Sequence, residues 1–253
     1  MIAAVAVVNI ALGLIYTCYG VMTVIDLKNG WRTQGLSHFG LAWIAMAFTC
    51  GPHHLEHGLH AAFIGGNAGV VDLVTVLLGA PAGVTWFLLR VEALTGGSGD
   101  RFIEGTPGWV RALPTIAVLY VVIAAGSIAW ILRDGVRLTP RIMPNILLLL
   151  VYTLIGYYLL RTQLNNRRPS GGWSVSGVAL TAVFPTCGVM HAVFASYAIS
   201  ASYRVESHGL LIDWLAVPAA IYFVWVVRAL HFGTLTDWNE GAEGVRTQVA
   251  LAV

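Results

Sequence analysis

Four of the eight histidines in this chain fall within eight residues, a spacing that can gather several imidazoles around one metal ion. The segment 51–60 reads Gly-Pro-His-His-Leu-Glu-His-Gly-Leu-His. If it is helical, five polar side chains share an arc of about 120° on one face: Cys50, His53, Glu56, His57 and His60. His54 lies off this polar stripe, at about 100° from His53.

Neutral imidazole is the commonest metal-binding side chain, and histidines four residues apart on a helix can hold one ion together. We therefore predict a transition-metal site with these ligands: His53, His57, His60, His191, Cys50 and Cys187. Such a donor set suits Zn, Cu or Fe, and the sulfur atoms favour copper. Three carboxylates are the predicted catalytic groups, with Glu56 as ligand orienter or general base: Glu56, Asp72 and Asp213.

A second segment resembles the first at an offset of 137 residues. Residues 49–54 read Thr-Cys-Gly-Pro-His-His, and residues 186–191 read Thr-Cys-Gly-Val-Met-His. His54 and His191 are thus expected at equal depth on two parallel helices. Bis-histidine ligation of haem b by this pair is an alternative to a bare metal ion.

The resemblance extends to a duplication of helices. Residues 9–20 and 145–156 share the pattern Asn-Ile-x-Leu-x-Leu-(Ile/Val)-Tyr-Thr-x-x-Gly at an offset of 136. We predict a 3+1+3 parallel repeat, in which helices 1–3 at about 3–90 match helices 5–7 at about 142–231. A linker helix at about 112–132 joins the two halves. Asp72 and Asp213 begin the third helix of each half, where they alternatively cap helix N-termini.

Composition places these elements in a membrane. The chain is 57% apolar and only 10% charged, well below the roughly 25% charged residues of soluble domains. Charged or Gly/Pro-rich breaks separate seven apolar stretches, each long enough to cross a bilayer, at about 3–25, 39–62, 69–90, 112–132, 142–161, 173–200 and 209–231. We predict an all-α integral membrane protein of seven transmembrane helices that contacts lipid and binds no nucleic acid. The longest loop, at about 91–111, is expected to be mobile.

Lysine and arginine distribution predicts the orientation of the helices. The loops after helices 1, 3 and 5, together with the C-terminal segment, hold ten of these residues, and the opposite side holds four. By the positive-inside rule, the N-terminus lies outside and the C-terminus in the cytoplasm. We expect a prokaryotic cell membrane, and self-association or membership of a membrane complex stays open.

Three functions are compatible with these features. The first is a metalloenzyme, an oxidoreductase or a hydrolase, acting on a lipidic or membrane-soluble substrate. The second is a transporter of a metal ion or small solute, which the duplicated halves favour. The third is a bis-histidine haem protein for electron transfer. A hydrogen-bonded network of Glu56 with the histidines, without any metal, is the structural alternative to all three.

The predicted orientation can be tested at the loop between the second and third helices. With Asn67→Cys in intact cells, an impermeant thiol reagent should label the protein, because the loop faces outward. The parent protein, with only its three native cysteines, is the control. Labelling only after lysis would reverse the orientation.

Overall fold

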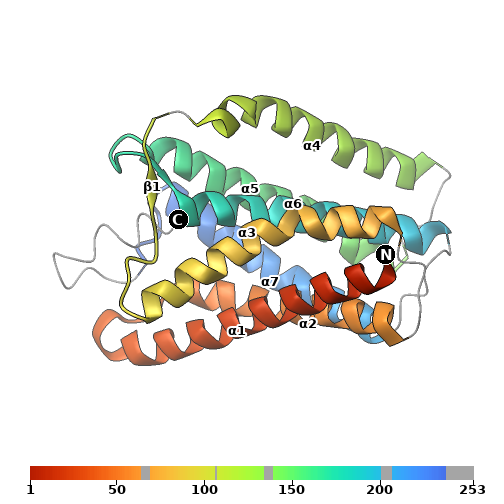
Figure 1. The fold of residues 1–253 in the computed structure, drawn as a ribbon, viewed down its shortest axis with the longest axis horizontal. Coiled ribbons are helices and arrows are strands. Elements are labelled where there is room, and N and C mark those ends of the chain that lie inside the picture. Colours follow the sequence, from red (N-terminus) through yellow and green to blue (C-terminus); the bar gives the residue numbers. More distant parts are fainter. Residues whose placement is uncertain (64–68, 106, 134–138, 201–206, 238–253) are drawn as a thin grey trace.

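In the part of the chain that the structure describes, seven long helices lie side by side along one axis (Figure 1). The computed structural model describes residues 1–63, 69–105, 107–133, 139–200 and 207–237. Its elements are α1 (Ile2–Gln34), α2 (His38–Phe63), α3 (Val70–Leu94), β1 (Phe102–Ile103), α4 (Gly108–Arg133), α5 (Met143–Asn166), β2 (Trp173–Ser174), α6 (Val175–Ser200) and α7 (Ser207–His231). The prediction of an all-helical protein is confirmed.

Six of the seven helices are long and apolar enough to cross a membrane. The exception is α2, because its second half carries the clustered histidines, which lower its mean hydropathy. Large apolar side chains such as Val118, Leu119 and Val122 are exposed on the outside of the bundle, where lipid would cover them. The protein is therefore membrane-embedded, with its apolar helices in contact with lipid.

The segment 91–111, predicted from its glycine content to be a long mobile loop, contains a short strand. Strand β1 within it pairs antiparallel with β2, so that Phe102 lies opposite Ser174 and Ile103 opposite Trp173. Asp100, just before β1, accepts hydrogen bonds from residues at the start of α6. These contacts tie the loop to the beginning of α6.

Helix packing follows the same scheme in the two halves of the chain. Helix α1 packs on α2 and α3, and α5 packs on α6 and α7. Helix α3 also packs on α6, while α7 packs on α2, so the third helix of each half crosses to the other half. Helix α4 lies at the edge against α6, and none of its described side chains is buried (Figure 1).

Glycines allow α1 and α2 to approach closely beside the histidine cluster. A Cβ added at Gly13 would lie 2.6 Å from Leu55 Cγ, and one at Gly58 would lie 2.6 Å from Ile10 Cγ1. A Cβ at Gly51 would collide with Thr17. Small residues at such crossings are typical of membrane helices, where close packing drives association.

Two aspartates hold the N-termini of α2 and α6 from the opposite half of the chain. Ser37 and Ser174 precede these helices, and each hydroxyl accepts a hydrogen bond from a backbone N–H three residues on, at 2.8 and 2.9 Å. Asp237, after α7, accepts from the Ser37 hydroxyl and from two backbone N–H groups of α2. Asp100, after α3, accepts from the Ser174 hydroxyl and one backbone N–H of α6. A carboxylate here complements the positive end of the helix dipole.

These caps predict a loss of stability on removal. Asp100→Ala and Asp237→Ala should each lower the free energy of unfolding by about 1–2 kcal/mol, because each removes the carboxylate that accepts from a serine hydroxyl and from at least one helix N–H group. Thermal unfolding in detergent measures the effect. Glu104→Ala changes an exposed carboxylate near the same loop and should leave the melting temperature unchanged. Equal melting temperatures for all three variants would contradict a capping role.

Candidate metal centre

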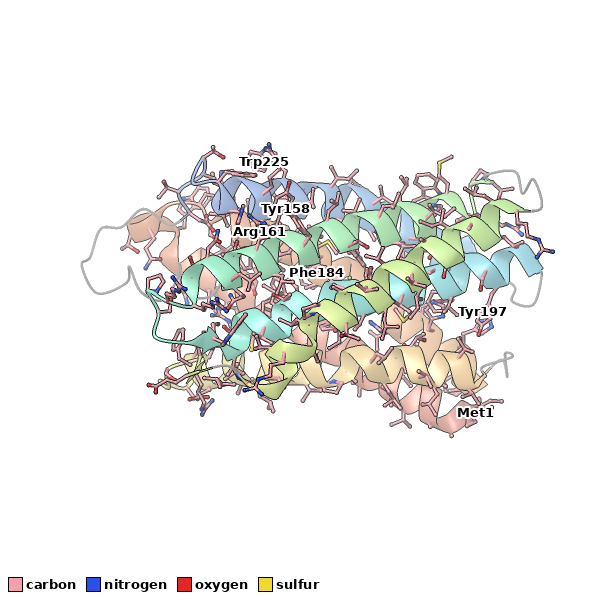
Figure 2. All side chains as sticks on the ribbon, turned by 90° about the horizontal axis from the view of Figure 1, so that it is seen from above. Met1, Tyr158, Arg161, Phe184, Tyr197 and Trp225 are labelled. Carbon is pink, nitrogen blue, oxygen red and sulfur yellow. The ribbon has the colours of Figure 1, made fainter. Side chains whose placement is uncertain are left out.

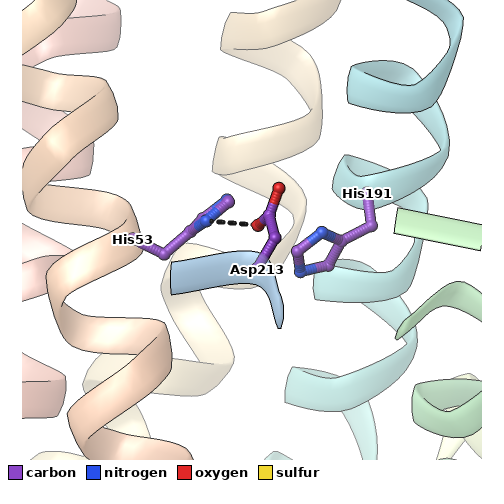
Figure 3. Close-up of side chains that lie close together, drawn as sticks. All are labelled: His53, His191 and Asp213. Carbon is purple, nitrogen blue, oxygen red and sulfur yellow. Dashed lines mark ion pairs between the residues drawn. The ribbon is translucent and has the colours of Figure 1, made fainter. Parts of the chain in front are cut away.

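Three side chains from three different helices meet inside the bundle. His53 of α2, His191 of α6 and Asp213 of α7 each offer a ligand atom, and these atoms all lie within 4.8 Å of one another (Figure 3). Their exposed fractions are 5%, 3% and 4%. A buried group of two imidazoles and a carboxylate is a donor set that can hold a metal ion.

The Asp213 carboxylate has partners on two neighbouring helices. Its Oδ1 lies 3.0 Å from His53 Nδ1 (Figure 3). Its Oδ2 accepts a hydrogen bond from Asn145 Nδ2, at 2.9 Å. A carboxylate buried in an apolar bundle is costly unless it is paired and hydrogen-bonded. Asp213 meets this condition in part, because Oδ2 is hydrogen-bonded, whereas Oδ1 is paired with His53 but accepts no hydrogen bond.

Asn145 of α5 connects this carboxylate to the second histidine. Its Oδ1 lies 2.6 Å from His191 Nδ1. Since the ionised carboxylate of Asp213 only accepts, Asn145 must donate to it through Nδ2 and accept through Oδ1. His191 Nδ1 therefore carries the hydrogen, and the lone pair of the neutral ring is on Nε2.

An equivalent asparagine–histidine contact occurs between α1 and α2. Asn9 Oδ1 lies 2.8 Å from His54 Nδ1, and the Tyr16 ring lies 5.5 Å from the His54 ring. In the other half, Tyr152 and His191 also have ring centroids 5.5 Å apart. The sequence comparison matched Asn9 with Asn145 and Tyr16 with Tyr152, but did not identify either asparagine as a site residue. The sequence did contain a signal for them, because an asparagine stands at matching positions of two otherwise apolar helices.

The two predicted aspartates occupy different positions. Asp72 lies in the first turn of α3, where Oδ2 accepts from the Gly69 N–H at 2.7 Å and from the Tyr197 hydroxyl at 3.0 Å. Asp213 lies one turn deeper, as the seventh residue of α7. The alternative role suggested by the sequence, that these aspartates cap helix N-termini, therefore applies to Asp72 and not to Asp213. If Pro81 and Pro218 are aligned, again at an offset of 137, the counterpart of Asp213 is the buried Val76.

The remaining predicted ligands lie outside the three-residue group. The His57 ring stacks on Phe194 at 4.0 Å and an interplanar angle of 8°, and its Nδ1 is 3.9 Å from Glu56 Oε2. His60 is buried near the end of α2. Cys50 and Cys187 line a cavity beside the group, and Cys50 Sγ lies 3.2 Å from the Tyr152 hydroxyl.

This cavity has a volume of about 10 Å³, and its wall is formed by Thr49, Cys50, His53, His54, Tyr152, Cys187, Met190, His191 and Ala216. A space of this size holds about one water molecule or one ion. His54 and His191 both face it, but a porphyrin does not fit between them. The haem alternative is therefore not carried further.

Comparison of the chain with protein-family models, with curated proteins and with solved structures found no match. The geometry of the site is thus the basis for a functional proposal.

The bridging role of Asn145 predicts unequal effects for the two asparagines. Asn145→Ala should lower the free energy of unfolding by about 2–3 kcal/mol, because it leaves a buried carboxylate oxygen and an imidazole N–H without partners. Asn9→Ala is the matched control. It removes the acceptor of the His54 N–H and a donor to the Val5 carbonyl, but it leaves no buried charge without a partner, and should cost about 1 kcal/mol. Chemical denaturation of both variants measures the two losses. Equal losses of unfolding free energy, or a larger loss for Asn9→Ala, would contradict the role of Asn145 as a bridge between Asp213 and His191.

Proposed function

We propose that this chain is an integral membrane metalloprotein that binds one transition-metal ion at His53, His191 and Asp213. The observation that carries the proposal is the convergence of these three buried side chains from three helices on one point. Intramembrane ionisable residues are rare and usually functional, because each is costly to bury.

An unused nitrogen favours a metal over a purely hydrogen-bonded network. His53 Nε2 is buried and has no hydrogen-bond partner. A buried polar atom without a partner costs about 1–3 kcal/mol, and such atoms are rare in folded proteins. Coordination of a metal ion by this nitrogen would remove the cost.

An aromatic layer supports a resident metal ion rather than a transported one. About 10–15 Å along the helices from the site, toward the start of α2, several rings pack together: Tyr19, Trp43, Trp86, Phe184 and Phe223. Phe184 lies midway along the bundle, and Tyr197 and Arg161 lie toward opposite ends (Figure 2). An ion leaving the site toward the Arg161 end would have to cross this layer.

We infer an enzymatic role, in which the metal ion supplies a Lewis acid or an oxidant-binding centre. Its substrate would be lipidic or membrane-soluble, because the site lies within apolar helices. The buried side chains around the site would exclude bulk water and fix the orientation of the His53 and His191 rings. Glu56 and His57, at the side toward the α2 C-terminus, would supply a polar entrance.

The duplication is part of this proposal. Repeated helix contacts, repeated asparagine–histidine contacts and reciprocal aspartate caps support two related halves around α4. Helix α2 would then be the seventh span, as long as α6 and packed between α1 and α7. These duplicated halves also favour the second candidate, a transporter. Metal uptake into proteoliposomes containing the purified protein would separate transport from catalysis.

Metal content tests the proposal directly. Protein purified after metal-replete growth should contain about one metal ion per chain by elemental analysis. His53→Ala and His191→Ala should each strip the ion, because each removes a ligand. His38→Ala, at the far end of α2, is the control and should retain it. Acidification should also release the metal, since protonated imidazole cannot ligate. Metal-free wild-type protein, or equal content in all variants, would overturn the proposal.

A further inference from the structure

We propose that the cavity beside His53 and His191 holds one water-sized ligand of the metal ion, and that His54 Nε2 accepts a hydrogen bond from this ligand. His54 contacts the bound ligand and not the metal. The inference rests on the proposed function, in which His53, His191 and Asp213 are the three protein ligands, and it names the small ligand that completes their coordination.

The cavity lies against two of the three protein ligands. Its volume of about 10 Å³ suits a single water molecule. His53 and His191 form part of its wall, whereas Asp213 does not. Metal centres that act on substrates commonly combine three protein ligands with one water molecule at an open position. A space of this size beside two ligand rings is where that position would lie.

Ring separations distinguish His54 from the two ligand histidines. Two imidazoles that share one ion in tetrahedral geometry, with metal–nitrogen distances of about 2.1 Å, have ring centroids about 5 Å apart. The His53 and His191 centroids lie 5.0 Å apart, and those of His53 and His54 lie 6.3 Å apart. His54 is also outside the group of ligand atoms that lie within 4.8 Å of one another. The larger separation leaves room for a small ligand between the ion and the His54 ring.

The orientation of Asn9 fixes the tautomer of His54. Asn9 Nδ2 donates a hydrogen bond to the Val5 carbonyl at 2.9 Å, so Oδ1 is the atom that faces His54 Nδ1, at 2.8 Å. An amide oxygen only accepts, so Nδ1 carries the hydrogen of the neutral ring and Nε2 carries the lone pair. This Nε2 is buried without a hydrogen-bond partner, on a residue that is 3% exposed and lines the cavity. A cavity ligand that donates to Nε2 would remove the cost of leaving it unpaired.

The two hydroxyl groups on the cavity wall already have partners within the protein. The Thr49 hydroxyl donates to the backbone carbonyls of Ala45 and Met46, each at 3.0 Å. The Tyr152 hydroxyl lies 3.2 Å from Cys50 Sγ. Among the described residues of the wall, the imidazole nitrogen of the preceding paragraph is therefore the best-placed acceptor for a ligand bound here.

The direction of this hydrogen bond selects the kind of ligand. Because His54 Nε2 accepts and does not donate in this tautomer, it favours a ligand that carries a hydrogen, such as water, over dioxygen or carbon monoxide, which carry none. Of the two chemical roles that the metal ion could have, this selectivity favours a Lewis acid that binds water over a centre that binds an oxidant.

Copper(II) is the probe for the cavity ligand, because its electron paramagnetic resonance lines report directly bound oxygen and fluorine nuclei. Metal-free protein in detergent, loaded with Cu²⁺, should show lines that broaden in ¹⁷O-enriched water. Ala216→Val adds two methyl groups at the cavity wall and should abolish the broadening while Cu²⁺ stays bound. Ala219→Val adds the same volume at another buried alanine of α7, which is not on the wall, and should keep the broadening.

Fluoride tests the hydrogen bond to His54, because it is about as small as water but carries no hydrogen. His54→Leu removes the acceptor that favours water, so fluoride affinity, read from ¹⁹F splitting of the Cu²⁺ lines, should rise about three- to tenfold. Asn9→Leu keeps the imidazole but frees it to place its hydrogen on Nε2 and donate it to fluoride, so the affinity should rise there too. His60→Leu changes a buried histidine of α2 that is not on the cavity wall, and should leave fluoride affinity unchanged. A merely structural role for His54 would lower the melting temperature without changing fluoride affinity.

The outcomes distinguish this inference from the proposed function. If wild-type protein binds Cu²⁺ but shows no ¹⁷O broadening, the inference fails while the metal site stands. Loss of Cu²⁺ from folded His54→Leu would make His54 a metal ligand, and unchanged fluoride affinity in that variant would remove its role as acceptor. Either result overturns the inference, and if His54→Leu does not fold, unchanged fluoride affinity in Asn9→Leu does so.

Sulfur ligation is the remaining alternative for the fourth position. A sulfur-to-copper charge-transfer band that disappears in Cys50→Ser or Cys187→Ser would overturn the inference as well. If wild-type protein binds no Cu²⁺ or other transition metal, the proposed function itself fails.

Discussion

A carboxylate in the apolar interior of a helix bundle must be neutralised and hydrogen-bonded by its neighbours, and Asp213 imposes this requirement on the whole structure. Its two oxygens engage His53 on α2 and Asn145 on α5, and Asn145 in turn engages His191 on α6. Four helices are thus connected through one charge. Because these bonds have directions, they also decide which nitrogen of each imidazole is left to bind a ligand.

The two halves of the chain make matching helix contacts and matching asparagine–histidine contacts, but they differ in chemistry. Each half has an asparagine on its first helix that orients a histidine on its second helix. Only α7 adds a buried acid, since the position of α3 that aligns with Asp213 holds Val76. His53 likewise aligns with Met190, and both line the cavity. The group of His53, His191 and Asp213 thus takes one ligand from the first half of the chain and two from the second.

Contacts between the two halves of the chain hold the helices that carry His53, His191 and Asp213 in position. The third helix of each half packs against the second helix of the other, and the segment that follows it caps the N-terminus of that same second helix. The paired residues again lie 137 apart: Ser37 with Ser174, and Asp100 with Asp237. The two histidine-bearing helices, α2 and α6, are therefore held at both their faces and their starting ends, which limits sliding of one against the other.

The sequence alone determined the helices, their membrane setting and the presence of matching motifs, because apolar runs, breaks and short motifs are local properties. It also located the histidine-rich part of α2. Only the tertiary structure decided which polar groups meet, since helical periodicity gives angles around one axis but not the rotation or depth of a helix against its neighbours. Hence His54, placed off the polar stripe, lines the cavity, whereas His57 on the stripe stacks on Phe194. Likewise Asp213, one turn deeper than Asp72, reaches the histidines, and Asn145 joins them through a contact between helices that no single-helix pattern contains.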